Sequence, residues 1–202
     1  VRAAGAGAWR AAGLQAAVAA RICTPDPALR KLDAAWLSTS GQRLIGWHEA
    51  DYPALLRNVG SPPAALWVRG QAHLLWQAQL AVVGSRRPTA GGRDHAHAFA
   101  RRFAEAGFVV CSGLAAGIDS AAHLGALQRG RTIAVLGNGP DLCYPPGNRE
   151  LLARIADEGA VVTEHHPDAS GYWPAQAVAS SVLTGGGPTS GTIDSVTAMT
   201  TC

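Results

Sequence analysis

The stretch LAVVGSRRPTAGG at residues 80–92 joins a short apolar run to a turn that is rich in glycine and arginine. The run that ends at Gly84 predicts a buried strand, and the glycines beyond it predict a turn that leads into a helix. Two fixed positive charges, Arg86 and Arg87, follow the strand directly. They admit two interpretations, a solvated loop or a site for an anion.

The same pattern of strand and helix repeats along the chain. Short apolar runs rich in β-branched residues stand at residues 79–84, 108–113, 132–137 and 160–164. Runs this continuous are typical of strands that are buried on both faces of a parallel sheet. Helical stretches that each end in a glycine separate them, at residues 92–107, 119–130 and 148–159. The alternation predicts an α/β domain with a doubly wound, mostly parallel sheet.

The helical stretches also predict side-chain positions. In the first of them an apolar stripe with helical spacing is formed by Ala96, Phe99, Ala100 and Phe103. In the second we expect Asp119 or Ser120 to be the N-cap residue. Asp119 and His123 are four residues apart, so we expect them to pair on one face of that helix.

The composition indicates a globular protein and excludes several classes. Of the 202 residues, 48% are hydrophobic and 15% are charged, and the net charge of +3 permits a nucleic-acid partner without requiring one. No apolar run approaches the roughly 20 residues of a membrane span, and no signal peptide is recognisable. The cysteines lack metal-ligand spacing, so we expect no metal site and reduced thiols in the cytoplasm: Cys23, Cys111, Cys143 and Cys202.

The chain divides into three parts by composition. Residues 1–45 are alanine-rich with weak helical signals, and we interpret them as a small helical extension. Residues 46–167 carry the α/β domain. Residues 168–202 contain only two charged residues, Asp168 and Asp194, among many Gly, Ser and Thr, which predicts a loop or a disordered tail. The only methionine is Met199, so we expect a fragment at the front and a foreign or frame-shifted sequence at the back.

The segment before the first strand is rich in aromatic residues and prolines. Prolines exclude a long helix or strand there. We expect its aromatic side chains to pack the segment against the larger domain, with stacking on nucleic-acid bases as the alternative: Trp47, Tyr52, Trp67 and Trp76.

Three of the four predicted strands end in glycine, at Gly84, Gly113 and Gly137. The carboxyl ends of parallel strands share one edge of a sheet, where glycine lets backbone N–H groups approach a ligand and helix N-termini add partial positive charge. The guanidinium groups of Arg86 and Arg87 can hold a phosphate in a bidentate fork. The sequence therefore indicates a phosphate-binding edge, although glycines that only turn the chain and solvated arginines would look the same.

Signatures of enzymes are incomplete or absent in the sequence. The GNG at residues 137–139 is only part of a dinucleotide fingerprint, and neither a Walker A loop nor a GxSxG elbow occurs. Ser85 and Ser112 have no identifiable base partner. We therefore predict a protein that is not an enzyme and takes no cofactor.

Four motifs in this region resemble the successive signatures of the DprA/Smf family, the DNA-processing proteins A of bacterial transformation. They are VVGSRRPTAGG (82–92), SGLAAGIDSAAHLGAL (112–127), TIAVLGNGPDLCYPPGN (132–148) and GAVVTEHHP (159–167). The segment DYPALLRNVGSPPAALWVRG (51–70) is similar to the one that precedes the family's Rossmann-like domain. Long motifs in the right order over residues 46–167 make the resemblance specific.

The resemblance implies a cytoplasmic protein that binds single-stranded DNA during natural transformation, protects incoming strands and helps load RecA recombinase, without catalysis. It implies a homodimer for a complete member of the family. It makes Arg86 the first candidate for a DNA phosphate contact, and Arg87 the second because it can point to solvent. It places in the same pocket Gly84, Ser85, Ser112, Gly113 and Gly137. It gives a supporting role to Gly117, Asp119 and His123.

The chain departs from the family pattern after Thr163-Glu164. The phenylalanine–proline and arginine–asparagine–arginine motifs that follow in the family are missing from residues 168–202. We therefore expect half a site, weak DNA binding and an exposed apolar sheet edge. Two alternatives stay open. One is a non-functional fragment. The other is an enzyme of the lysine-decarboxylase-like phosphoribohydrolase type, although the stretch TGGGPTSGT (184–192) resembles the glycine-rich loop of those enzymes only superficially.

Overall fold

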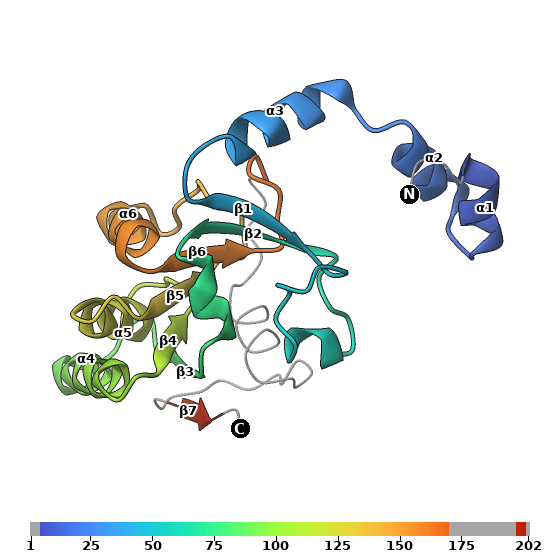
Figure 1. Cartoon of the computed structure of the whole chain (residues 1–202). Coiled ribbons are helices and arrows are strands. Elements are labelled where there is room, and N and C mark those ends of the chain that lie inside the picture. The colour runs from blue at the N-terminus through green and yellow to red at the C-terminus, as the bar shows by residue number, and fades with distance from the viewer. Residues whose placement is uncertain (1–4, 170–196, 201–202) are drawn as a thin grey trace. The chain divides into compact units, whose positions relative to one another are not determined.

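The computed structural model describes residues 5–169 and 197–200, and it divides into two compact units, residues 1–40 and 41–202. The first unit holds three helices, Gly5–Ala11 (α1), Ala16–Cys23 (α2) and Pro27–Leu37 (α3) (Figure 1). Helix α3 begins as its sequence dictates, because the Asp26 carboxylate accepts the Ala28 N–H at 2.8 Å and a proline follows the cap. The expected helical extension is therefore confirmed.

The second unit is built on a mixed sheet with the strand order β1-β2-β6-β5-β4-β3-β7. Its strands are Gln42–Gly46 (β1), Ala65–Gly70 (β2), Gln79–Val83 (β3), Val109–Ser112 (β4), Thr132–Val135 (β5), Ala160–Thr163 (β6) and Thr197–Thr200 (β7). Strands β3 to β6 pair in parallel and correspond to the four predicted runs. The α/β class with a mostly parallel sheet is thus confirmed.

The borders of the sheet are antiparallel and come from segments in which no strand was expected. Strand β1 begins at Gln42, inside the segment 1–45 that the sequence assigned to helix, ends at Gly46 and pairs with β2. Strand β7 pairs with β3 and lies within residues 168–202. Most of that expected tail, including the glycine-rich stretch 184–192, lies outside the described residues.

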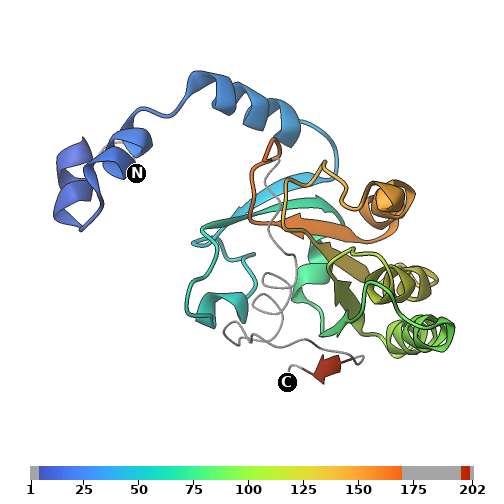
Figure 2. The ribbon, with the colours of Figure 1, turned by 180° about the vertical axis from the view of Figure 1, so that it is seen from behind.

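The helices that connect the parallel strands lie on one face of the sheet (Figures 1 and 2). They are Ala90–Glu105 (α4), Ile118–Leu127 (α5) and Arg149–Glu158 (α6). The strands follow one another across the sheet in chain order, and right-handed crossovers that always advance in the same direction put every helix on the same side. A doubly wound sheet would carry helices on its second face as well. Among the described residues, that face is covered by the segment between β1 and β3.

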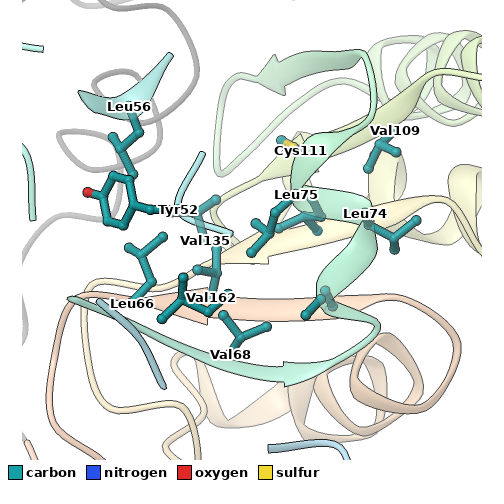
Figure 3. Close-up of a cluster of buried hydrophobic side chains, with 14 of the residues drawn as sticks. Tyr52, Leu56, Leu66, Val68, Leu74, Leu75, Val109, Cys111, Val135 and Val162 are labelled. Carbon is teal, nitrogen blue, oxygen red and sulfur yellow. The ribbon is translucent and has the colours of Figure 1, made fainter. Parts of the chain in front are cut away.

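The segment between β1 and β3 covers that second face (Figure 3). It contains the short 3-10 helices Leu56–Asn58 (η2) and Ala72–Trp76 (η3). Tyr52 is buried there against the strand residues Val135 and Val162, as the packing interpretation of the aromatic residues predicts. Trp47 and Trp76 are 49% and 44% exposed, so packing does not account for all of them.

The face of α4 that meets its neighbour consists of small residues. Ala96, Ala100 and Ala104 are buried, whereas Phe99 is 52% exposed. The predicted stripe is therefore wrong at Phe99. Helix α5 approaches α4 closely, since a Cβ built on Gly125 would lie 2.2 Å from the backbone oxygen of His97, and a phenylalanine ring does not fit into such a contact.

The helices of the described residues are too short or too polar to cross a membrane.

Candidate functional site

The candidate site is the edge of the sheet at which the parallel strands end, here called the carboxyl edge. It comprises the β3–α4 loop (residues 84–89), the β4–α5 loop (113–117) and the β5–α6 loop (136–148). The parallel pairing of β3, β4 and β5 brings the three predicted glycines to this one edge. All three are buried: Gly84, Gly113 and Gly137.

A carboxylate of the protein itself occupies part of the predicted anion cradle. Asp119 is only 4% exposed, and its Oδ2 accepts the N–H groups of Gly113 at 3.1 Å and Ala115 at 3.3 Å. Burial raises the pKa of Asp119 to about 6, while hydrogen bonds from the backbone N–H groups of Ala115, Gly113 and Gly84 oppose that shift. Backbone donors that the sequence assigned to a bound phosphate therefore hold Asp119.

Asp119 acts from inside α5 and not as its cap. The helix begins at Ile118, and its N-cap residue is Gly117 with φ 88° and ψ −120°. Ser120 Oγ donates to the Ala115 carbonyl at 2.7 Å. The predicted caps are thus wrong by two to three residues, because Gly117 adopts a conformation that ends the preceding loop.

Ser112 lies beneath the edge and not on it. Its side chain is fully buried, and Oγ donates to the Val82 carbonyl of the neighbouring strand at 2.7 Å. The sequence predicts that this hydroxyl lines the site. Instead it is buried below the site, where it links β3 and β4.

His123 is fully buried beside the central strands. Its Nδ1 lies 2.7 Å from Thr132 Oγ1, and that hydroxyl donates to the Val110 carbonyl at 2.9 Å. A hydroxyl that donates elsewhere must accept here, so Nδ1 carries the proton. Burial lowers the pKa of His123 to about 3, with the Ser112 backbone opposing the shift. The expected pair with Asp119 does not form, because the Asp119 carboxylate is held by N–H groups of the β4–α5 loop, whereas His123 Nδ1 donates to Thr132 of β5.

The β3–α4 loop presents its arginines at the surface while its backbone is held from below. Ser85 accepts the Ile118 N–H through its carbonyl at 3.1 Å, and its Oγ accepts the Arg87 N–H at 3.1 Å. Thr89 Oγ1 caps α4 by accepting the Gly92 N–H at 3.1 Å. Arg86 and Arg87 are both exposed.

The side chain of Asn148 links the β5–α6 loop to the β4–α5 loop and to the start of α5. Asn148 Nδ2 donates to the Leu114 carbonyl at 2.8 Å and to Ser120 Oγ at 2.9 Å. Leu114 is itself buried at a φ of 59°, in the left-handed region that a leucine rarely adopts. This loop is therefore fixed from several sides.

Two further exposed arginines, missed in the sequence, stand in the first turns of helices that start at this edge. Arg93 lies in the first turn of α4, and Arg149 is the first residue of α6. Their place directly after loops of the carboxyl edge is a signal that the sequence does contain. Guanidinium groups beside helix N-termini are the chemistry that binds phosphate oxygens.

No three His, Cys, Asp or Glu side chains gather closely enough to hold a metal ion among the residues that the structure describes.

Comparison with known proteins gives a consistent family signal. Residues 43–172 match the family of the DNA recombination-mediator protein A. The chain is 44% identical over 122 residues to Protein Smf of Synechocystis, covering 58% of this chain and 31% of that protein. It is 34% identical over 119 residues to the DNA processing protein DprA of Bacillus subtilis, covering 58% and 40%. The chain thus spans about a third of the length of these curated relatives.

Two solved structures share the fold. The X-ray structure of DNA processing protein A from Streptococcus pneumoniae matches with a TM-score of 0.71 and 29% identity, covering 85% of this chain and 59% of that one. DNA processing protein A from Helicobacter pylori, a structure described for that protein's single-stranded DNA binding mode, matches with a TM-score of 0.63 and 26% identity, covering 71% and 65%.

Proposed function

This chain belongs to the family of the DNA recombination-mediator protein A, and we propose from that premise that its carboxyl edge binds the phosphates of single-stranded DNA. The observation that carries the proposal is the β3–α4 loop, where Arg86 and Arg87 are exposed above a backbone that is held in place. Arg86 is the principal phosphate contact, and Arg87 is secondary. Arg93 and Arg149 extend the positive surface along the same edge.

The buried residues have a supporting role in this proposal. Asp119 and His123 shape the strand ends from beneath. Gly84 lets the β3–α4 loop pack closely against Ile118 of α5, and the buried Gly113 and Gly137 line the same edge. Phosphate contacts carry no sequence information, so binding is tolerant of DNA sequence. The contact is one of binding alone and involves no catalysis or cofactor.

For the complete protein we propose the role that the family resemblance implies. It acts in the cytoplasm as a homodimer, protects incoming single strands during DNA uptake and helps load RecA recombinase onto them. The DNA-binding mode described for the Helicobacter pylori relative supports the first of these steps.

The test is fluorescence anisotropy of a labelled oligo-dT with the wild-type chain and its Arg86→Ala variant at two salt concentrations. Loss of one charge-assisted phosphate contact should weaken binding about tenfold. The control is Arg102→Ala, because Arg102 is 72% exposed near the other end of α4, beside Glu105. Equal affinities of the wild-type and Arg86→Ala proteins would refute the proposed site.

A further inference from the structure

We infer that Gly117 is a positioning residue for Arg86: the β4–α5 loop sets the conformation of the arginine-bearing loop through a contact that only glycine permits. The inference rests on the proposed function, because Arg86 is taken as the phosphate contact. Gly117 itself acts through that arginine and is not assigned a contact with DNA.

The contact is between backbones. A Cβ built on Gly117 would lie 2.4 Å from the Ser85 carbonyl oxygen, 2.9 Å from the Arg86 carbonyl carbon and 2.7 Å from Pro88 Cδ. Real Cβ atoms do not come this close to other heavy atoms, and a peptide group and a proline ring cannot swing aside as the tip of a long side chain can. A side chain at residue 117 must therefore displace one of the two loops.

The β4–α5 loop is the one that is held more firmly. Asp119 accepts two of its N–H groups, and Asn148 Nδ2 donates to the Leu114 carbonyl. Three hydrogen bonds, two of them to the buried Asp119 carboxylate, resist a retreat of this loop.

The arginine loop gives way more easily because its outer side is exposed. Its described backbone tie to α5 is the Ile118 N–H to the Ser85 carbonyl at 3.1 Å, the same oxygen that a Cβ at residue 117 would strike. Displacement should break this hydrogen bond and shift the peptide between Ser85 and Arg86. A shift of the order of an ångström is enough to spoil a bidentate contact.

Backbone strain alone has a matched control in this chain. Gly117 has φ +88°, and Gly107, after α4, has φ +93° with open space where a Cβ would stand. Alanine at either position is strained by its positive φ, but only alanine at residue 117 meets the arginine loop. Comparing the two variants separates the contact from the strain.

The experiment measures oligo-dT affinity and its salt dependence for wild type, Gly117→Ala, Gly107→Ala, Arg86→Ala and the double variant Gly117→Ala/Arg86→Ala. Near-ultraviolet circular dichroism checks folding. We expect about tenfold weaker binding for Gly117→Ala and unchanged binding for Gly107→Ala. The double variant should bind no more weakly than Arg86→Ala, because Gly117 acts through Arg86. The salt slope of Gly117→Ala should match that of Arg86→Ala.

The outcomes separate the two proposals. If Arg86→Ala binds like wild type, the proposed site and this inference both fall. If Arg86→Ala is weakened but folded Gly117→Ala is not, or if the two losses add, only the positioning role is overturned. Should Gly117→Ala fail to fold, Gly84→Ala takes its place, since its Cβ would meet Ile118 Cγ1 at 2.8 Å and press on the same loop. If Gly84→Ala weakens binding in the wild-type chain but not in the Arg86→Ala background, the inference is supported. If folded Gly84→Ala binds with wild-type affinity, the inference is overturned.

Discussion

Asp119 and His123 lie one turn apart on α5 and are both buried, but their pKa values shift in opposite directions. Burial raises the Asp119 pKa from 3.8 to about 6, so the native state holds this proton more tightly than the unfolded chain and stability falls as the pH rises from about 4 to 6. Burial lowers the His123 pKa from 6.5 to about 3, so the unfolded chain takes up the proton first and stability rises with pH between about 3 and 6.5. The two effects oppose each other between about pH 4 and 6.

Replacing either residue should leave the pH dependence of stability that the other one causes. The free energy of unfolding of His123→Asn, taken relative to wild type, should fall with rising pH by roughly 1.4 kcal/mol per unit between about pH 4 and 6. That of Asp119→Asn should rise by a similar amount over the same window. Urea unfolding at four pH values checks both, and the difference from wild type removes the contributions of shared groups. Curves that run parallel to wild type would contradict the two pKa shifts.

At the scale of elements, the contact between α4 and α5 depends on the absence of a side chain at Gly125. Alanine in a helix is ordinarily favoured over glycine by about 1 kcal/mol. Here its Cβ would lie 2.2 Å from the His97 carbonyl oxygen and 3.2 Å from Arg101 N, so overpacking should dominate. We expect Gly125→Ala to lower the free energy of unfolding by about 1–3 kcal/mol.

The control for this prediction is Gly91→Ala. Gly91 lies in the first turn of α4 with open space around its Cβ position. Thermal and urea unfolding should show little change or a small gain for Gly91→Ala. Equal stability of the two variants would mean that the helices can separate without cost.

The elements themselves were predictable where the sequence pattern is local. Continuous apolar runs and terminal glycines predict β3 to β6 and the helices between them. Strand β1 was missed because QRLIG contains two polar residues and lies at the border of the sheet, where one edge has no partner strand among the described residues. The glycine edge was also predictable, but the placement of Asp119 within it depends on contacts between loops from different strands, which spacing does not reveal.

At the scale of the whole molecule, 17 basic and 14 acidic residues leave a net charge of only +3. A charge this small gives little long-range attraction, so DNA binding should depend on the few arginines of the carboxyl edge. Two phosphate contacts, by Arg86 and Arg87, predict that log K falls with log salt with a slope of about −1.4. A salt titration of oligo-dT binding checks this, and a slope steeper than about −4 would show that many more basic residues take part.

The strand order described above also has a consequence for how the chain folds. Strands β3, β4, β5 and β6 are neighbours in sequence as well as in the sheet, so each can add to a template that is already present, at a small cost in loop-closure entropy. Strand β2 precedes them in the chain but pairs with β6, aligning Trp67 with Thr163. During synthesis β2 can pair with β1 at once, but it must wait for β6 before it joins the parallel strands. Pulsed hydrogen exchange should find the amides of β4 and β5 protected before the β2 amides that face β6, so that strands made early in this domain join its parallel strands late.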